Sequence, residues 1–300
     1  MNILLKKTIA VFLFVSFVFG FKAQSIQMYF PHFAGKTYDF VFFQGAEAKT
    51  IIKGTIPLDG KFSLTIPQEY KGYTGMSRWL ITGTKEGGGL DMFIPGHDFS
   101  VSCEAAEPND KNIVYTDNNG NSELNTLYRK QEEIIQRFET MQQAISVFPK
   151  TEKNYNVFKQ ELLRQQKAFE TFHIGLEKNT DYISHFIPVI NITRGTGNRL
   201  YTEKKDTAAN IENYITRVMD WKELYTSGHW STVIDTWLMI HTAQLNDVQR
   251  FVTSFKSIRT KLGGGKFETE FIKRVIYMLN ENKATEYTKA LNLLNISSNS

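Results

Sequence analysis

The sequence predicts an α+β protein in two parts, an N-terminal antiparallel β-sandwich followed by an all-α region with a long helical hairpin. Residues 25–105 are short β-branched and aromatic runs separated by turn residues. Residues 109–121 are polar and rich in turn formers, as in a linker. Beyond them, apolar residues recur every three or four positions, the period of an amphipathic helix. We therefore expect a sandwich domain over 24–108, a linker over 109–121, a helical domain over 122–296 and a short tail over 297–300.

The first residues have the features of an export signal. A basic pair, Lys6 and Lys7, precedes an apolar run over residues 8–21 that is too short for a membrane span. We expect residues 1–23 to be a signal peptide and Gln24 to be the first mature residue, with an uncleaved membrane anchor as the alternative. Because no cysteine directly follows the run, the expected product is not a lipoprotein but a protein of the periplasm or cell envelope.

Charge and cysteine content exclude several classes of function. The net charge of +4 comes largely from lysines of the expected signal peptide, so the mature chain is nearly neutral. We therefore expect neither nucleic acid nor, once the leader is removed, a membrane as a partner. An exported chain with one cysteine has no internal disulfide, and its single thiol cannot cycle between dithiol and disulfide.

About seven short strands are expected in the first part, at the spacing of a sandwich. The clearest hairpin is "IPLDGKFSLTIP", in which Asp59 and Gly60 supply the backbone angles of a tight turn. Phe62, Leu64 and Ile66 alternate with polar residues, which predicts one buried and one exposed face.

In the second part, two long amphipathic helices are expected to form an antiparallel hairpin. We expect Ser122 to cap the first helix and Pro149 to end it, and "FPKTEKN" joins it to the second. Pro188 is expected to kink or stop the helix "DYISHFIPVINI". "WSTVIDTWLMIHTAQ" is apolar nearly all round and predicts a buried helix. "LGGGKFE" predicts a turn between helices, and "GTKEGGGLD" a hairpin loop.

No motif specifies a metal, a cofactor or a catalytic set, so we expect none of the three. The histidines lack the i, i+4 spacing of a metal pair; they are His32, His97, His173, His185, His229 and His241. "TDNNGNSEL" resembles the start of a calcium loop but lacks its glycine and its final glutamate, so a polar turn before a helix is the better interpretation. Arg194 and Arg199 offer an anion site, although a solvated surface explains them better.

Cys103, the only cysteine, is the one candidate reactive group. It lies in the expected strand "FSVSC" beside Glu104, with no basic neighbour to activate it, and a buried inert thiol is favoured. The alternative is a peroxidase or oxidoreductase that acts through Cys103 with an external resolving thiol. A third alternative is a small-molecule binder with an aromatic cleft, for which the candidates are Trp79, Trp221, Trp230 and Trp237.

The order of the expected segments along the chain resembles that of a known family. A leader, a β domain with "DGKFSLTIP" and "FIPGHDFSVS", and a helical region that begins "NSELNTLYRKQEEI" resemble exported Bacteroidetes thioredoxin-like proteins of the thiol–disulfide oxidoreductase or alkyl hydroperoxide reductase type. In that family, such a β domain of unknown function and helical segment precede a C-terminal thioredoxin-like domain with a CxxC motif. This sequence has no CxxC and stops at "NISSNS", so we expect the front part of such a protein, natural or truncated.

These observations favour a non-catalytic accessory or binding protein over an enzyme. The resemblance implies a role beside a thioredoxin-like redox protein, and we expect the chain to dock a protein partner of the cell envelope. The candidate docking surfaces are the edge strands of the sandwich and the groove between the two long helices.

Overall fold

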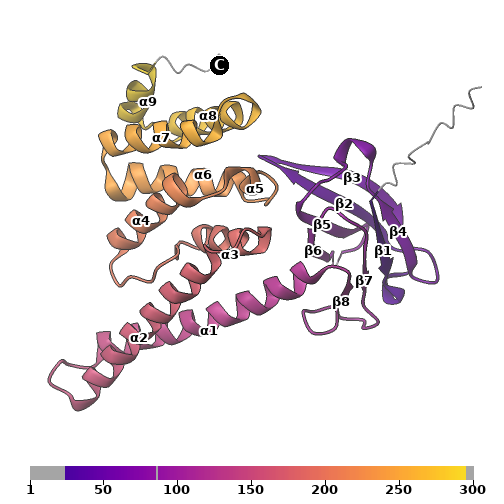
Figure 1. Ribbon diagram of the computed structural model, residues 1–300, viewed down its shortest axis with the longest axis horizontal. Helices are drawn as coiled ribbons and strands as arrows, with labels where there is room; N and C mark the ends of the chain where they lie inside the picture. Colours follow the sequence, from indigo (N-terminus) through magenta and orange to yellow (C-terminus); the bar gives the residue numbers. More distant parts are fainter. Residues whose placement is uncertain (1–23, 86, 295–300) are drawn as a thin grey trace, which may run out of the picture.

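The computed structural model describes residues 24–85 and 87–294, and the expected signal peptide and C-terminal tail lie outside these ranges. Within them the fold is α+β, as predicted, with a β-sandwich followed by a stack of helices (Figure 1). The strands are β1 (Ser25–Tyr29), β2 (Thr37–Gln44), β3 (Glu47–Thr55), β4 (Lys61–Thr65), β5 (Gly75–Thr82), β6 (Gly89–Ile94), β7 (Phe99–Ser102) and β8 (Val114–Thr116). Two short 3-10 turns, η1 (Pro31–Phe33) and η2 (Gln68–Tyr70), lie between strands.

The helices follow β8. They are α1 (Asn119–Val147), α2 (Lys153–Leu176), α3 (Tyr182–Thr193), α4 (Lys204–Asn213), α5 (Trp221–Tyr225), α6 (Trp230–Met239), α7 (Val248–Leu262), α8 (Gly265–Glu281) and α9 (Thr285–Asn292). Two π-helical segments, η3 (Tyr214–Val218) and η4 (Ile240–Leu245), continue α4 and α6. No helix in the described part of the chain combines the length and apolarity needed to cross a membrane.

The described strands form two four-stranded sheets that pack face to face. One has the order β4-β1-β7-β8 and the other the order β3-β2-β5-β6. All pairs are antiparallel except β1 and β7, which run parallel. The predicted alternation in β4 is confirmed, because Leu64 is buried while Ser63 and Thr65 are exposed. Between the sheets lies an aromatic-rich core that includes Phe40, Phe42 and Trp79.

The predicted hairpin at Asp59 and Gly60 is wrong. The turn itself has the expected chemistry, since Asp59 Oδ1 accepts the Lys61 amide at 3.0 Å and Gly60 has φ +73°. However, β3 and β4 belong to different sheets, so the turn carries the chain from one sheet to the other. The Phe30 amide donates to the Gly60 carbonyl at 2.9 Å, which seats the turn against the end of β1. The tight hairpin is instead the turn at Gly45 between β2 and β3.

The segment expected to be a linker, residues 109–121, has structure of its own. It contributes β8, which pairs with β7 at the edge of the sandwich, and the first residues of α1. Ser122 is not the cap that we expected, because α1 begins earlier and its N-cap residue is Asn118. The reason is a tertiary contact. The side-chain amide groups of Asn118 and Asn121 form hydrogen bonds with the backbone of Phe93 in β6, and these bonds fix where the helix starts.

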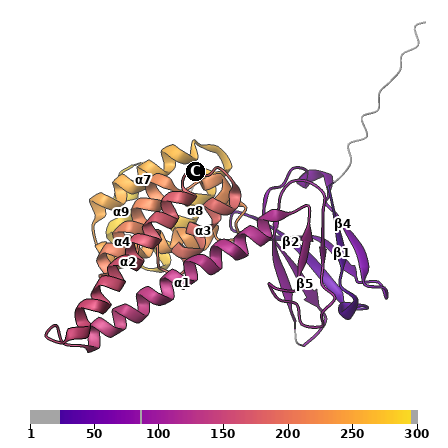
Figure 2. The same ribbon diagram turned by 60° about the horizontal axis from the view of Figure 1, so that its bottom comes forward.

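The long helices form the predicted antiparallel hairpin. Helix α1 ends at Val147, just before the predicted stop at Pro149, and the hairpin tip projects away from the sandwich (Figures 1 and 2). Pro188 does not stop α3, which continues to Thr193. Burial of most of this helix outweighs the one backbone hydrogen bond that proline removes.

The later helices stack into one core, and α6 lies at its centre between α3 and α8. The prediction of a buried helix is confirmed, because Trp230, Val233, Ile234 and Trp237 are fully buried. Gly263 ends α7 in the left-handed conformation (φ +68°), as its sequence predicts. "GTKEGGGLD" joins β5 to β6, as expected of a hairpin loop.

The sandwich and the helical stack are joined by a continuous junction. The Gly45 amide donates to the Tyr225 carbonyl at 2.7 Å, and the Met76 amide donates to the Thr226 carbonyl at 2.9 Å. Met76 and Phe93 belong to the helical core, in which the Phe93 ring stacks on another aromatic ring with 5.1 Å between centroids. The sheet β3-β2-β5-β6 therefore serves as a platform that orients α1 and the helical stack.

Candidate functional site

An apolar groove runs between α1 and α2, where the sequence predicts a docking surface. Its volume is about 650 Å³. It is lined by Leu127, Lys130 and Ile134 of α1 and by Arg164, Lys167, Ala168, Thr171, Phe172, Gly175, Leu176 and the following Asn179. On α2 the lining covers residues 164–176, which is about 18 Å of helix at 1.5 Å per residue. The groove can therefore accept about three turns of a partner helix.

Two small residues of α2 line the groove. Ala168 and Gly175 are seven positions apart and therefore share one face of the helix. A Cβ atom built on Gly175 would meet no atom within 4 Å, so nothing in the described structure fills that space. A glycine in a helix interior costs about 1 kcal/mol relative to alanine. This cost is not offset by close packing at Gly175, which is exposed and has free space beside it.

Cations line the rim of the groove. The Lys130 ammonium lies 5.7 Å from the centre of the Phe172 ring. Arg164 pairs with Glu161 at 2.7 Å and Lys167 with Glu170 at 2.8 Å, both within α2. The hydrogen bond from Arg164 lowers the pKa of Glu161 to about 2. The groove residues themselves include three basic side chains and no acidic one among the described residues.

A buried polar network holds the hairpin against α3. Gln131 of α1 and Asn191 of α3 exchange two hydrogen bonds of 3.0 Å. Asn191 also lies 3.2 Å from His173 Nε2 of α2. Burial lowers the pKa of His173 to about 4, so the ring is neutral at pH 7 and accepts the amide hydrogen. Because three helices share this network, the spacing between α1 and α2 is fixed.

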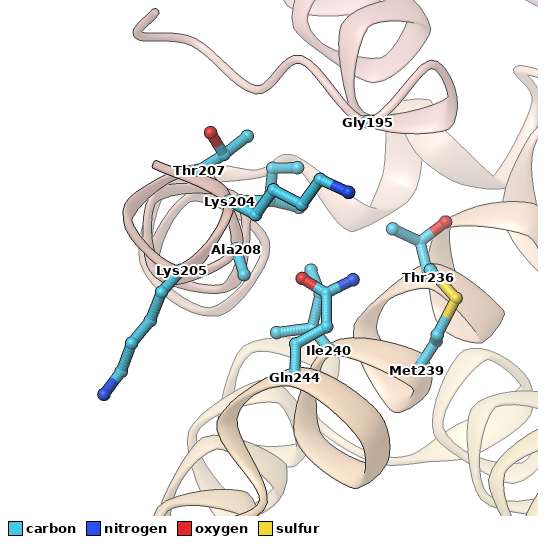
Figure 3. A pocket seen from close by; sticks show the side chains of 10 residues that line it. Gly195, Lys204, Lys205, Thr207, Ala208, Thr236, Met239, Ile240 and Gln244 are labelled. Atoms are coloured by element: carbon cyan, nitrogen blue, oxygen red, sulfur yellow. The ribbon is translucent and has the colours of Figure 1, made fainter. Parts of the chain in front are cut away.

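A second pocket, of about 580 Å³, lies between α4 and the end of α6 with η4 (Figure 3). Its lining residues are Gly195, Lys204, Lys205, Thr207, Ala208, Ile211, Thr236, Met239, Ile240 and Gln244. In Figure 3 the Lys204 side chain extends over the pocket, the Gln244 amide points into it, and Lys205 points away. No sequence motif marks this site, because its residues come from separate helices.

Behind this pocket lies a buried ionic cluster. Glu212, next to the lining residue Ile211, accepts hydrogen bonds from Arg250 at 2.7 Å and from Thr216 at 3.2 Å. His241, next to the lining residue Ile240, is fully buried with its Nε2 3.8 Å from the Glu212 carboxylate. Burial lowers the pKa of His241 to about 4, so it is neutral at pH 7.

One other group has the composition of a metal site. His185, Asp220 and Glu223 place ligand atoms within 4.8 Å of one another. His185 Nδ1 lies 2.7 Å from Glu223, and its Nε2 lies 3.1 Å from the Asn179 carbonyl. Asp220 accepts the Lys222 amide as the N-cap of α5. The sequence could not have shown this group, since His185 comes from α3 whereas Asp220 caps α5 and Glu223 lies within it. The His185–Glu223 hydrogen bond and the cap at Asp220 explain the arrangement as a junction between α3 and α5.

Cys103 lies at the end of β7 in the sandwich core and is 1% exposed. Its Sγ lies 3.4 Å from Asn112 Oδ1 and 3.7 Å from the Ala105 carbonyl. Peroxidatic or exchange chemistry requires an accessible thiolate, and the position of this thiol offers no access. The geometry therefore favours the predicted structural role over the redox alternative.

The remaining sequence candidates have structural partners. Arg194 pairs with Glu132 at 2.9 Å and Arg199 with Glu170 at 3.1 Å, so both arginines tie their loop to the hairpin. Trp79 packs in the sandwich core, whereas the other tryptophans pack in the helical core. The four rings therefore do not line a common cleft. In the calcium-like segment, Asn118 and Asn121 bind the Phe93 backbone as described above.

Comparison with known proteins gives no relative: no family model, no curated protein and no solved structure matches the chain. The thioredoxin-like resemblance therefore stays a prediction.

Proposed function

We propose that this chain is an exported, non-catalytic accessory protein that docks a partner protein at the cell envelope through the α1–α2 groove. The observation that supports this proposal is the groove itself, an apolar channel with free space at Gly175 and with basic side chains at its rim. In keeping with the sequence resemblance, the partner acts beside a thioredoxin-like redox protein. The burial of Cys103 supports a role without thiol chemistry.

The occupant that fits the groove is an amphipathic helix with an acidic border. Leu127, Ile134 and Leu176 offer apolar contacts, which such a helix meets with residues at i, i+3, i+4 and i+7. Lys130 favours Asp and Glu on the flanks of that helix and disfavours a basic helix, whereas Arg164 and Lys167 are each paired with a glutamate of α2.

The test is binding of a designed helical peptide, measured by fluorescence anisotropy. The probe has leucines on one face and glutamates elsewhere, and its counterparts replace glutamate by lysine or scramble the same residues. We expect the acidic helix to bind more tightly than either counterpart and to weaken with added salt.

Two variants locate the binding. Gly175→Leu fills the groove and raises helix propensity, so the protein should fold while affinity falls at least about tenfold. Lys167→Glu reverses one rim charge, and Lys159→Glu, an exposed position of α2 outside the groove lining, is its matched control. The proposal fails if the three peptides bind alike, or if Gly175→Leu leaves the affinity unchanged.

A further inference from the structure

We propose that the pocket between α4 and η4 is a binding site for a small amphiphilic anion, a carboxylate that carries an aliphatic tail. This site is separate from the α1–α2 groove and does not depend on the proposed docking function. Its volume of about 580 Å³ lies within the range of small-molecule sites, about 300–1,000 Å³.

The walls of the pocket suit an aliphatic tail. Ala208, Ile211 and Ile240 line it and are themselves buried, so the apolar surface belongs to fixed parts of the core. Met239 stands at the rim and is 51% exposed. An unbranched, polarisable methionine adapts its shape to an apolar ligand, and ligand burial would remove this exposed side chain from water.

The mouth of the pocket suits a negative head group. The charge directed over it is that of Lys204, since the neighbouring Lys205 points away, and no carboxylate lines the pocket among the described residues. Figure 3 shows the Lys204 side chain over the pocket, with the Gln244 amide directed into it from below. An ammonium and an amide N–H are donors, which a carboxylate matches with its acceptor oxygens. A cationic head group would be repelled.

Contacts in the core behind the pocket fix the residues of its floor. The Glu212–Arg250 ion pair braces the end of α4, next to Ile211. The Tyr287 hydroxyl donates to the His241 carbonyl at 2.8 Å, next to Ile240. The pocket borders the π-helical segment η4, and such segments occur frequently at functional sites. Side chains that are fixed in this way form a site without a rearrangement of the helices.

The test uses decanoate as the probe, below its micellar concentration, with binding measured by calorimetry on the full chain. Decanol and decyltrimethylammonium serve as the neutral and cationic comparators. We expect decanoate to bind most tightly and the cation not to bind. In parallel, the Met239 methyl resonance should shift on titration with decanoate, because this side chain borders the tail. Equal binding of all three amphiphiles, or an unmoved Met239 resonance, would overturn the proposal.

Two adjacent lysines provide a matched pair of variants. Lys204→Glu should weaken decanoate binding about tenfold, because an attraction becomes a repulsion. Lys205→Glu makes the same charge change on a side chain that points away, and it should have a much smaller effect (Figure 3). Gln244→Trp, at an exposed position, should block the pocket without disturbing the core. Equal losses for the two lysine variants, or full binding in Gln244→Trp, would contradict the assigned site.

Discussion

Replacing Asn121 by leucine tests how α1 is attached to the sandwich. Asn121 is 4% exposed, and its Oδ1 accepts the Phe93 amide hydrogen at 2.9 Å while its Nδ2 lies 3.3 Å from the Phe93 carbonyl. Phe93 lies in β6, which is an edge strand among the described residues, so its outer backbone groups have no neighbouring strand there. The asparagine therefore supplies the partners that a further strand would provide.

The expected loss follows from these contacts. The leucine leaves the Phe93 amide without its acceptor, and an unsatisfied buried donor costs about 1–3 kcal/mol. The Phe93 carbonyl keeps the bond from Asn118 Nδ2 at 2.8 Å, so the second contact adds little. Leucine regains about 0.5 kcal/mol in helix propensity. We expect a net loss of about 2 kcal/mol, which lowers the melting temperature by about 4–8 °C.

The assay is urea denaturation of Asn121→Leu and of Asn125→Leu, a half-buried asparagine one turn further along α1. The control makes the same chemical change and should be neutral or slightly stabilising. Hydrogen exchange should show faster exchange of the Phe93 amide in Asn121→Leu only. If both variants have the same stability, or if the Phe93 amide stays equally protected, the hydrogen bonds of Asn121 to Phe93 do not hold α1 against the sandwich.

Three further predictions test the core and the junction. Cys103 is buried, so a thiol reagent should label the native protein about a hundredfold more slowly than the unfolded chain, and rapid native labelling would refute its structural role. His173 has a folded-state pKa of about 4, below its unfolded value of about 6.5, so its contribution is complete above pH 6.5 and is lost as the pH falls. Urea midpoints should accordingly show that wild type loses about 2 kcal/mol more than His173→Gln between pH 7 and 5, and equal losses would refute this. Gly45 and Gly72 both have positive φ, but only a Cβ at Gly45 would meet the Tyr225 ring, at 2.6 Å. Gly45→Ala should therefore lower the urea midpoint more than Gly72→Ala. Equal shifts of the two midpoints would refute the close approach of Gly45 to Tyr225.

Local chemistry predicted much of the fold. The alternation around Leu64, the end of α1 before Pro149 and the glycine stop of α7 at Gly263 all depend on residues close in sequence. They were confirmed because tertiary packing agrees with the local preference in each case.

The errors arose where a distant contact decides the outcome. The turn at Gly60 was predicted to close a hairpin, but pairing of β4 with β1 sends the chain to the other sheet. Ser122 was predicted as the cap of α1. The helix instead begins after Asn118, because the Phe93 backbone forms hydrogen bonds with the side chains of Asn118 and Asn121. Pro188 stays inside α3 because the surrounding core holds that helix. Each of these contacts joins residues that no local window contains.

The candidate sites were predicted only in part. The groove between the long helices was expected from the hairpin alone, and the available signal for its position was Gly175 inside an amphipathic helix. The pocket between α4 and η4 was not predicted. It depends on which way Lys204 points and on how two helices pack, and neither is encoded in a short motif.

The central claim is that the α1–α2 groove receives an acidic amphipathic helix, and hydrogen exchange with and without the designed peptide tests it most directly. We predict added protection on the two groove-lining stretches, residues 127–134 and 164–179, and its loss in Gly175→Leu. Protection that instead falls on the edge strand β3 or around α4, or that persists in Gly175→Leu, would contradict the claim.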